Sequence, residues 1–182
     1  MTKTLILGGA RSGKSRHAEA LAAASGKRVL YVATAQAGDA EMLDRIALHR
    51  QQRDPGWATL EENIELGKLI EQHSASDCLI LIDCVTLWLS NLLFSEARDF
   101  PDVGKITPPS QFEVQRKNLL HALQHATGDV ILVSNEVGMG IVPSGAVSRW
   151  FVDEAGRLNQ ALAAVCDHVS LVVAGLPLSL KA

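Results

Sequence analysis

The sequence predicts one α/β domain over residues 1–182, in which helices cover both faces of a mostly parallel sheet. Short apolar runs alternate along the chain with longer amphipathic stretches, which is the pattern of successive βα units. The runs are continuous in Val, Ile and Leu, as expected for strands buried on both faces. Apolar residues make up 47% of the 182 residues and charged residues 20%, so the chain can bury a full core.

The elements follow from these runs in chain order. The apolar runs predict strands over 4–7, 29–33, 79–82, 130–133 and 169–173. The amphipathic stretches predict helices over 14–24, 40–52, 64–73, 86–94, 111–126 and 148–165. Residues 96–110 contain three prolines, which block helix continuation. We expect an exposed loop there, inside the domain, and a mobile lid is the less favoured alternative.

Composition argues against several classes of protein. A net charge of −3 without a basic stripe disfavours nucleic acid as a partner. The three cysteines (Cys78, Cys84 and Cys166) form no C-x-x-C, so we expect reduced thiols and neither a disulfide framework nor a zinc site. No stretch approaches the ~18 apolar residues of a membrane-spanning helix. We therefore expect a cytoplasmic protein.

Residues 8–15 carry the strongest short motif. Gly8-Gly9-Ala10-Arg11-Ser12-Gly13-Lys14-Ser15 matches G-x-x-x-x-G-K-[ST] at every required position, between a predicted strand and a predicted helix. In such a loop, backbone N–H groups and the positive end of the following helix converge on phosphate oxygens. Lys14 would bind the β- and γ-phosphates and Ser15 would ligate Mg²⁺. The sequence context argues against a chance match, so we predict a P-loop NTPase-type fold.

Asp83 follows the third predicted strand. In open α/β sheets the carboxyl ends of the strands face the ligand, so this carboxylate could hold Mg²⁺, a water or a ribose hydroxyl. The alternative is a cap for the helix that begins near Thr86. The sequence favours the ligand-binding interpretation and leaves the cap open.

His49 lies near the end of the second predicted helix, among arginines. Arg45 is four residues away on the same helix face, and Arg50 and Arg53 add two more cations. Such a cluster suits an anionic ligand, and an imidazole within it could act as a nucleophile on phosphorus. The alternative is a solvated helix end, where cations are favoured by the helix dipole. From the residues alone, the solvated helix end is favoured.

Several blocks occur in order along nearly the whole chain and carry a family resemblance. They are residues 8–16 and 31–35, Glu41-Met42, Arg45-Ile46, His49-Arg50, Trp57, Thr59, Glu61, residues 133–143, Phe151, Asp153, Gly156-Arg157, Asn159-Gln160 and residues 172–175. The block Val-Ser-Asn-Glu-Val-Gly-Met-Gly-Ile-Val-Pro over 133–143 is far more specific than a phosphate loop alone. Together they resemble the bifunctional adenosylcobinamide kinase/adenosylcobinamide-phosphate guanylyltransferase family of cobalamin synthesis.

The resemblance implies two reactions. The first phosphorylates the aminopropanol hydroxyl of adenosylcobinamide with ATP or GTP. The second transfers GMP from GTP to adenosylcobinamide phosphate through a covalent GMP–histidine intermediate, which places the nucleophile at His49. Because a histidine on a helix must be delivered to the α-phosphorus, the predicted helix over 40–52 should shift when GTP binds. The resemblance also implies a homo-oligomer, with a trimer as the expected form.

The same resemblance implies the residues of the nucleotide site. Residues 8–15 would hold the phosphates, and Ala33, Thr34 and Ala35 would line the site. Arg50, Gln51, Gln52 and Arg53 would follow the nucleophile. Glu61 and Asp83 would contact the guanosine, although the family often has glutamate where this chain has Asp83.

Two other functions compete with this one. A small-molecule or nucleotide kinase of the same fold would form no covalent intermediate. A nucleotide-dependent switch or assembly ATPase would hydrolyse slowly and transfer nothing to a corrinoid. No obvious residue positions a catalytic water, which makes the switch the least favoured.

Overall fold

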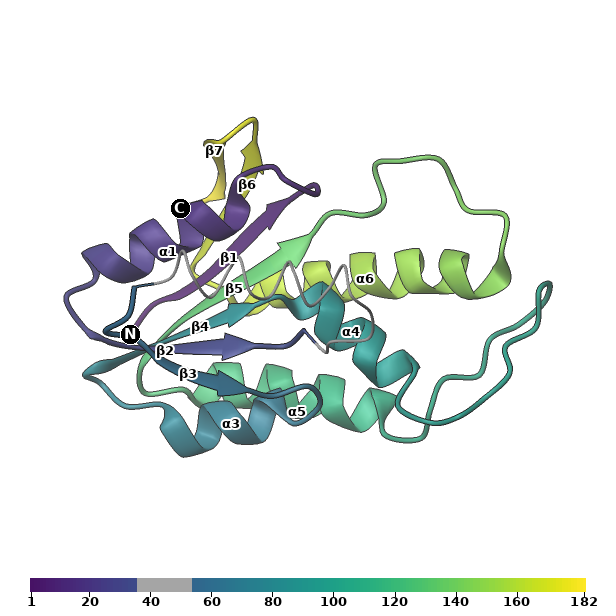
Figure 1. Ribbon diagram of the computed structural model, residues 1–182, viewed down its shortest axis with the longest axis horizontal. Coiled ribbons are helices and arrows are strands. Elements are labelled where there is room, and N and C mark those ends of the chain that lie inside the picture. The colour runs from purple at the N-terminus through teal and green to yellow at the C-terminus, as the bar shows by residue number, and fades with distance from the viewer. Residues whose placement is uncertain (36–53) are drawn as a thin grey trace.

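A computed structural model describes residues 1–35 and 54–182 and shows the predicted α/β architecture (Figure 1). Its strands are β1 (Lys3–Gly8), β2 (Arg28–Ala33), β3 (Ala58–Glu61), β4 (Cys78–Asp83), β5 (Asp129–Asn135), β6 (His168–Val173) and β7 (Leu176–Lys181). Its helices are α1 (Lys14–Ala24), α3 (Leu66–His73), α4 (Val85–Leu93), α5 (Phe112–His125) and α6 (Ala146–Val165). The predicted helix over 40–52 lies outside the described residues.

The described strands form one sheet in the order β3-β2-β4-β5-β1-β6-β7. All neighbouring pairs are parallel except β6 and β7, which are antiparallel. The five predicted strands are therefore confirmed, as is the mostly parallel sheet. That residues 1–182 form one domain stays a prediction.

Helices cover both faces of the sheet, as predicted. Helix α1 packs on one face, against β1, β4, β5 and β6, and α3, α4, α5 and α6 lie on the other (Figure 1). The core on the α1 face includes Ile6, Ala18, Ala22, Leu79 and Val133. The core on the opposite face includes Leu5, Ile80, Trp88, Leu123 and Leu158. Successive residues of a strand alternate between these two cores, because side chains alternate across a pleated sheet.

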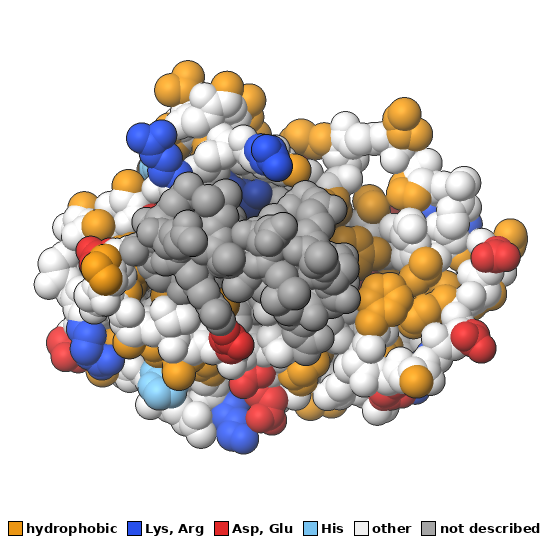
Figure 2. Space-filling view, viewed as in Figure 1, with side chains coloured by type: hydrophobic (Ala, Val, Ile, Leu, Met, Phe, Trp, Pro, Cys, Tyr) orange, Lys and Arg blue, Asp and Glu red, His pale blue; other side chains and the backbone are white. Residues whose placement is uncertain are grey.

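The two edge strands were not predicted. Strand β3 has four residues, all exposed, and only Leu60 is a large apolar residue. Strand β7 begins Leu-Pro, and Pro177 is tolerated because an edge strand has N–H positions that need no ladder partner. Its residues Leu176, Leu178 and Leu180 are all more than half exposed, and apolar side chains of this hairpin lie at the top of Figure 2. Solvent exposure removes the continuous apolar run that reveals a central strand.

The segment after α4 is irregular, as the prolines predict. Residues 96–110 contain no helix or strand, and Arg98 forms an ion pair with Glu96. The loop is not exposed throughout, because Ile106 is only 5% exposed and the Asp102 carbonyl accepts the N–H of Ala146 at 3.1 Å. Among the described residues, no helix is both long and apolar enough to cross a membrane.

Candidate nucleotide site at the carboxyl edge of the sheet

The phosphate loop connects β1 to α1 with the geometry that the motif requires. Gly13 is left-handed, with φ of 95°, and a Cβ at Gly8 would lie 2.5 Å from the Ser12 Oγ and 2.7 Å from the Val172 carbonyl oxygen. Glycine is therefore required at Gly8 by a close approach and is favoured at Gly13 by its conformation. The Ser12 carbonyl accepts the N–H of Gly175 at 2.8 Å, which ties the loop to the turn of the C-terminal hairpin.

Two polar groups inside the loop are suited to an anion. The Lys14 side chain is 9% exposed, and its Nζ donates to the Gly9 carbonyl at 3.1 Å, so the ammonium folds back over the loop. The Ser12 Oγ is buried and has no hydrogen-bond partner among the described residues. A buried unpartnered hydroxyl is costly, and a phosphate oxygen would satisfy it. Ser15 lies on the first turn of α1, directly after the phosphate loop.

The strand register aligns three of the predicted residues. Ala33 pairs with Asp83 on one side and with Glu61 on the other, so the ends of β3, β2 and β4 form one row. The end of β1 lies at the same edge, where Gly8 pairs with Asn135 of β5. The structure thus brings the phosphate loop, Ala33, Glu61 and Asp83 to the carboxyl edge of one sheet, where ligands bind in this class of fold.

Asp83 does not cap the following helix. Its Oδ2 accepts the Tyr31 hydroxyl at 3.2 Å, whereas the cap of α4 is the Cys84 Sγ, which accepts the N–H of Leu87 at 3.4 Å. Both Tyr31 and Cys84 belong to the core on the α1 face. The Asp83 carboxylate therefore lies on the face that carries α1, and the ligand-binding interpretation keeps its geometric basis.

Thr34 and Ala35 continue from the end of β2. Thr34 is completely buried, and its Oγ1 donates to the Cys84 carbonyl at 2.8 Å and accepts the Cys84 N–H at 2.9 Å. Its carbonyl accepts the Asn91 Nδ2 at 2.8 Å. These bonds fix the β2 end to the β4 end and hold the Thr34 backbone in place. Ala35 is half-buried.

The three cysteines are free thiols, as predicted, and all three are buried. Burial raises the pKa of the Cys84 thiol to about 12, and the adjacent Asp83 carboxylate adds to the rise, while the Lys14 charge opposes it. Burial likewise raises the pKa of Cys166 to about 12. Cys84 is therefore a neutral thiol beneath the site, with Asp83 and Lys14 close enough to influence its charge.

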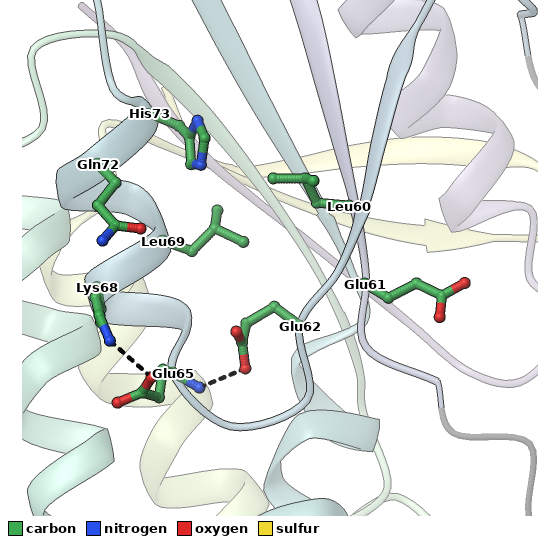
Figure 3. A pocket seen from close by; sticks show the side chains of 8 residues that line it. All are labelled: Leu60, Glu61, Glu62, Glu65, Lys68, Leu69, Gln72 and His73. Atoms are coloured by element: carbon green, nitrogen blue, oxygen red, sulfur yellow. Dashed lines mark hydrogen bonds and ion pairs between the residues drawn. The ribbon is translucent and has the colours of Figure 1, made fainter.

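Glu61 borders a groove between β3 and α3, which has a volume of about 320 Å³ (Figure 3). In Figure 3 the Glu61 carboxylate points away from the other residues that line the groove. The Glu62 Oε1 accepts the N–H groups of Ile64 and Glu65, both at 2.8 Å, and thus satisfies backbone donors ahead of α3. The polar groups of the groove thus serve the start of α3. Glu61 instead belongs to the row that it forms with Ala33 and Asp83 at the carboxyl edge of the sheet.

A polar network at the end of β5 was not predicted from the sequence. Thr86 and Ser134 Oγ atoms lie 3.1 Å apart, the Ser134 Oγ donates to the Asn159 Oδ1 at 2.8 Å, and the Asn135 N–H donates to the Thr86 Oγ1 at 2.6 Å. Asn135 ends an apolar strand as Asp83 does, and that signal was available in the sequence.

The remaining predicted site residues lie outside the part of the chain that the structure describes. His49, Arg50, Gln51, Gln52 and Arg53 all fall within residues 36–53. The described chain stops at Ala35, just beyond the end of β2, and resumes at Asp54, ahead of β3. The structure therefore tests neither the nucleophile nor the arginines beside it.

The fold and the phosphate loop define a nucleotide-binding P-loop NTPase. Solved structures agree in fold: a RadB recombinase has a TM-score of 0.52 at 19% identity, over 93% of this chain and 73% of that chain. A type III secretion system ATPase has a TM-score of 0.54 at 14% identity, over 98% of this chain and 56% of that chain. At such identities the likeness shows the fold alone.

The sequence comparisons narrow the class to one family. The family model described as cobinamide kinase / cobinamide phosphate guanyltransferase matches residues 4–180, and the chain belongs to this family. The bifunctional adenosylcobalamin biosynthesis protein CobP of Pseudomonas aeruginosa is 50% identical over 179 residues, which cover 98% of this chain and 97% of that protein. The bifunctional CobU proteins of Escherichia coli (strain K12) and Salmonella typhimurium are 45% and 43% identical, each over 97% of this chain and 98% of that protein. The chain is thus a kinase and guanylyltransferase of cobalamin biosynthesis, and the predicted family is confirmed.

Proposed function

We propose that the phosphate loop serves both reactions, with His49 as the nucleophile of the second. In the first reaction the adenosylcobinamide hydroxyl attacks the γ-phosphorus of ATP or GTP, the bond to the nucleoside diphosphate breaks, and the hydroxyl proton is released. In the second, a neutral His49 nitrogen attacks the α-phosphorus of GTP and pyrophosphate leaves. An oxygen of adenosylcobinamide phosphate then attacks the same phosphorus, breaks the P–N bond and frees the imidazole.

The described residues support the phosphate-binding part of this proposal. The Lys14 ammonium and the unpartnered Ser12 hydroxyl lie within the loop, where both can stabilise charge on phosphate oxygens. The Ser15 hydroxyl fits the preference of Mg²⁺ for oxygen ligands, and bound Mg²⁺ would neutralise phosphate charge. Glu61 and Asp83 end neighbouring strands on either side of Ala33 and are our proposed guanosine contacts.

Four residues beside the nucleophile complete the proposed site. Arg50, Gln51, Gln52 and Arg53 would bind the triphosphate as it presents its α-phosphorus, a role for which Arg is suited by its bidentate geometry. Ala33, Thr34 and Ala35 would line the nucleotide from the end of β2. The observation that carries the proposal is the family match over residues 4–180 together with the geometry of the phosphate loop.

Labelling with α-³²P-GTP tests the nucleophile. We expect the wild-type chain to carry acid-labile label on a denaturing gel, and His49→Ala to carry none while still phosphorylating adenosylcobinamide. His73→Ala is the matched control, because His73 lies at the end of α3 in the groove of Figure 3, and it should label normally.

The other outcomes point to the competing functions. Phosphorylation of adenosylcobinamide without any covalent label would contradict the transferase step and leave a small-molecule kinase. Nucleotide hydrolysis without transfer to the corrinoid would point to a switch or assembly ATPase. Label that persists in His49→Ala would place the nucleophile at another residue.

We also propose that the chain forms a homo-oligomer, with a trimer as the form expected from the family resemblance. The exposed leucines of β7 support self-association, because large exposed apolar patches often mark interfaces. Sedimentation equilibrium measures the mass, and a monomer at micromolar concentration would contradict the proposal. A cytoplasmic location and the absence of a nucleic-acid partner stay predictions, supported by the three free thiols and by the net charge of −3.

A further inference from the structure

Asn135 ends β5 beside the phosphate loop, and its side chain lies on the face of the sheet that carries α1. It pairs in register with Gly8, the first residue of the loop, and the Glu136 N–H donates to the Gly8 carbonyl at 3.1 Å. Ile131 and Val133 of the same strand pack in the core on the α1 face. Because side chains alternate along a strand, Asn135 is on that face too.

A direct contact of the side chain agrees with this orientation. The Asn135 Nδ2 lies 3.9 Å from the Sγ of Cys84, which belongs to the core on the α1 face. Sulfur is a weak acceptor, so this contact leaves most of the donor capacity of the amide unused. The Lys14 charge influences the same thiol. The Asn135 amide therefore lies on the face that carries α1, at the strand end that pairs with Gly8, where the phosphate loop begins. Lys14 of this loop is the residue expected to bind the β- and γ-phosphates.

The backbone of Asn135 is held from the opposite face by buried side chains. Strand β4 ends at Asp83, which pairs with Val133, so the β4 ladder does not extend to Asn135. The Asn135 N–H therefore has no partner on β4 and donates instead to the Thr86 Oγ1. The Asn159 Nδ2 donates to the Asn135 carbonyl at 3.2 Å.

Thr86, Ser134 and Asn159 are each at most 7% exposed. A buried polar network is favourable only when its members are satisfied, and this one fixes the position of a single peptide unit. The backbone of Asn135 is thus held in place independently of its side chain.

We infer that Asn135 is a binding residue for the terminal phosphate of the nucleoside triphosphate, with its Nδ2–H donating to a γ-phosphate oxygen. Thr86 and Asn159 are positioning residues that act through the Asn135 backbone. The inference rests on the proposed use of this loop for a triphosphate. The γ-phosphate is transferred in the kinase step and leaves with pyrophosphate in the guanylyl step, so this one contact would serve both reactions.

The test compares triphosphate with diphosphate binding by calorimetry. α,β-Methylene GTP and α,β-methylene GDP are suitable probes, because neither can lose its leaving group at the α-phosphorus. We expect Asn135→Ala to lower the affinity for the triphosphate analogue about tenfold or more, because a hydrogen bond to a charged group is lost. The affinity for the diphosphate analogue should not change. Asn118→Ala, an exposed asparagine on α5, is the matched control and should change neither affinity.

Each outcome decides the inference. Equal weakening of both analogues, or no weakening of either, would overturn it, because a merely structural role does not distinguish the γ-phosphate. Should Asn135→Ala fail to fold, the isosteric Asn135→Asp decides instead. Its carboxylate should repel the triphosphate more than the diphosphate, and an unchanged ratio of the two affinities would overturn the inference. Failure of the wild-type chain to bind either analogue would instead contradict the proposed nucleotide site.

Discussion

The centre and the edges of this sheet differ in how they are stabilised. Strands β4, β5 and β1 lie between two helical layers, and their apolar side chains are almost completely buried. Strands β3 and β7 form the two edges, and every residue in each of them is exposed. The centre therefore supplies the hydrophobic stability that holds the loop ends in place, whereas the edges contribute particular side chains and surfaces, among them Glu61 on β3. Four substitutions test this difference.

Leu132→Ala should have the largest effect. Leu132 is fully buried at the centre of β5, and its truncation removes apolar contacts and leaves a cavity. We expect the free energy of unfolding to fall by about 2–5 kcal/mol. Denaturant titration measures it, and a loss below about 1 kcal/mol would show that the centre does not dominate stability.

Thr86→Val removes the acceptor of the Asn135 N–H while keeping the side-chain shape. A buried donor left without a partner costs about 1–3 kcal/mol, so the free energy of unfolding should fall by that amount. Thermal and denaturant unfolding measure the change. A neutral result would mean that the polar network at the end of β5 is not needed to hold the strand end.

Asp129→Asn should have a smaller and pH-dependent effect. Burial alone would raise the pKa of Asp129, but the Lys27 ammonium and the Thr2 N–H, each at 2.8 Å, outweigh it and lower the pKa. The ionised carboxylate thus stabilises the folded chain above its unfolded pKa of about 3.9, and this contribution is lost as the pH falls through the lower folded value. The melting temperatures of the wild type and Asp129→Asn should differ at pH 6 and converge near pH 2; a difference independent of pH would contradict this account.

Leu178→Ala should have the smallest effect on the isolated chain. Leu178 is 59% exposed on β7, and surface substitutions usually change stability by no more than about 0.5 kcal/mol. In a homo-oligomer that uses this hairpin, the same substitution should instead lower the mass seen by sedimentation. Unfolding at two protein concentrations separates the two cases, since only an oligomer has a concentration-dependent melting temperature.

Much of the fold was predictable, and the reason is local. Continuous apolar runs revealed the five inner strands, and the glycines around Lys14 revealed the loop, because both signals lie within a few adjacent residues. The edge strands escaped prediction because exposed strands have no such run. At the site, the positions of Lys14 in the loop and of Asp83 at the end of its strand were predictable, but the cap of α4 by Cys84 was not, since thiols are uncommon helix caps.

By itself, the sequence determined the class of fold, the phosphate loop and the family, because each can be recognised from residue types at a fixed spacing. Only the tertiary structure decided that Glu61, Ala33 and Asp83 stand in one row and that Asn135 lies beside Gly8. Strand order and register are set by packing between segments far apart in the chain, so a local sequence pattern does not show which strands pair with each other.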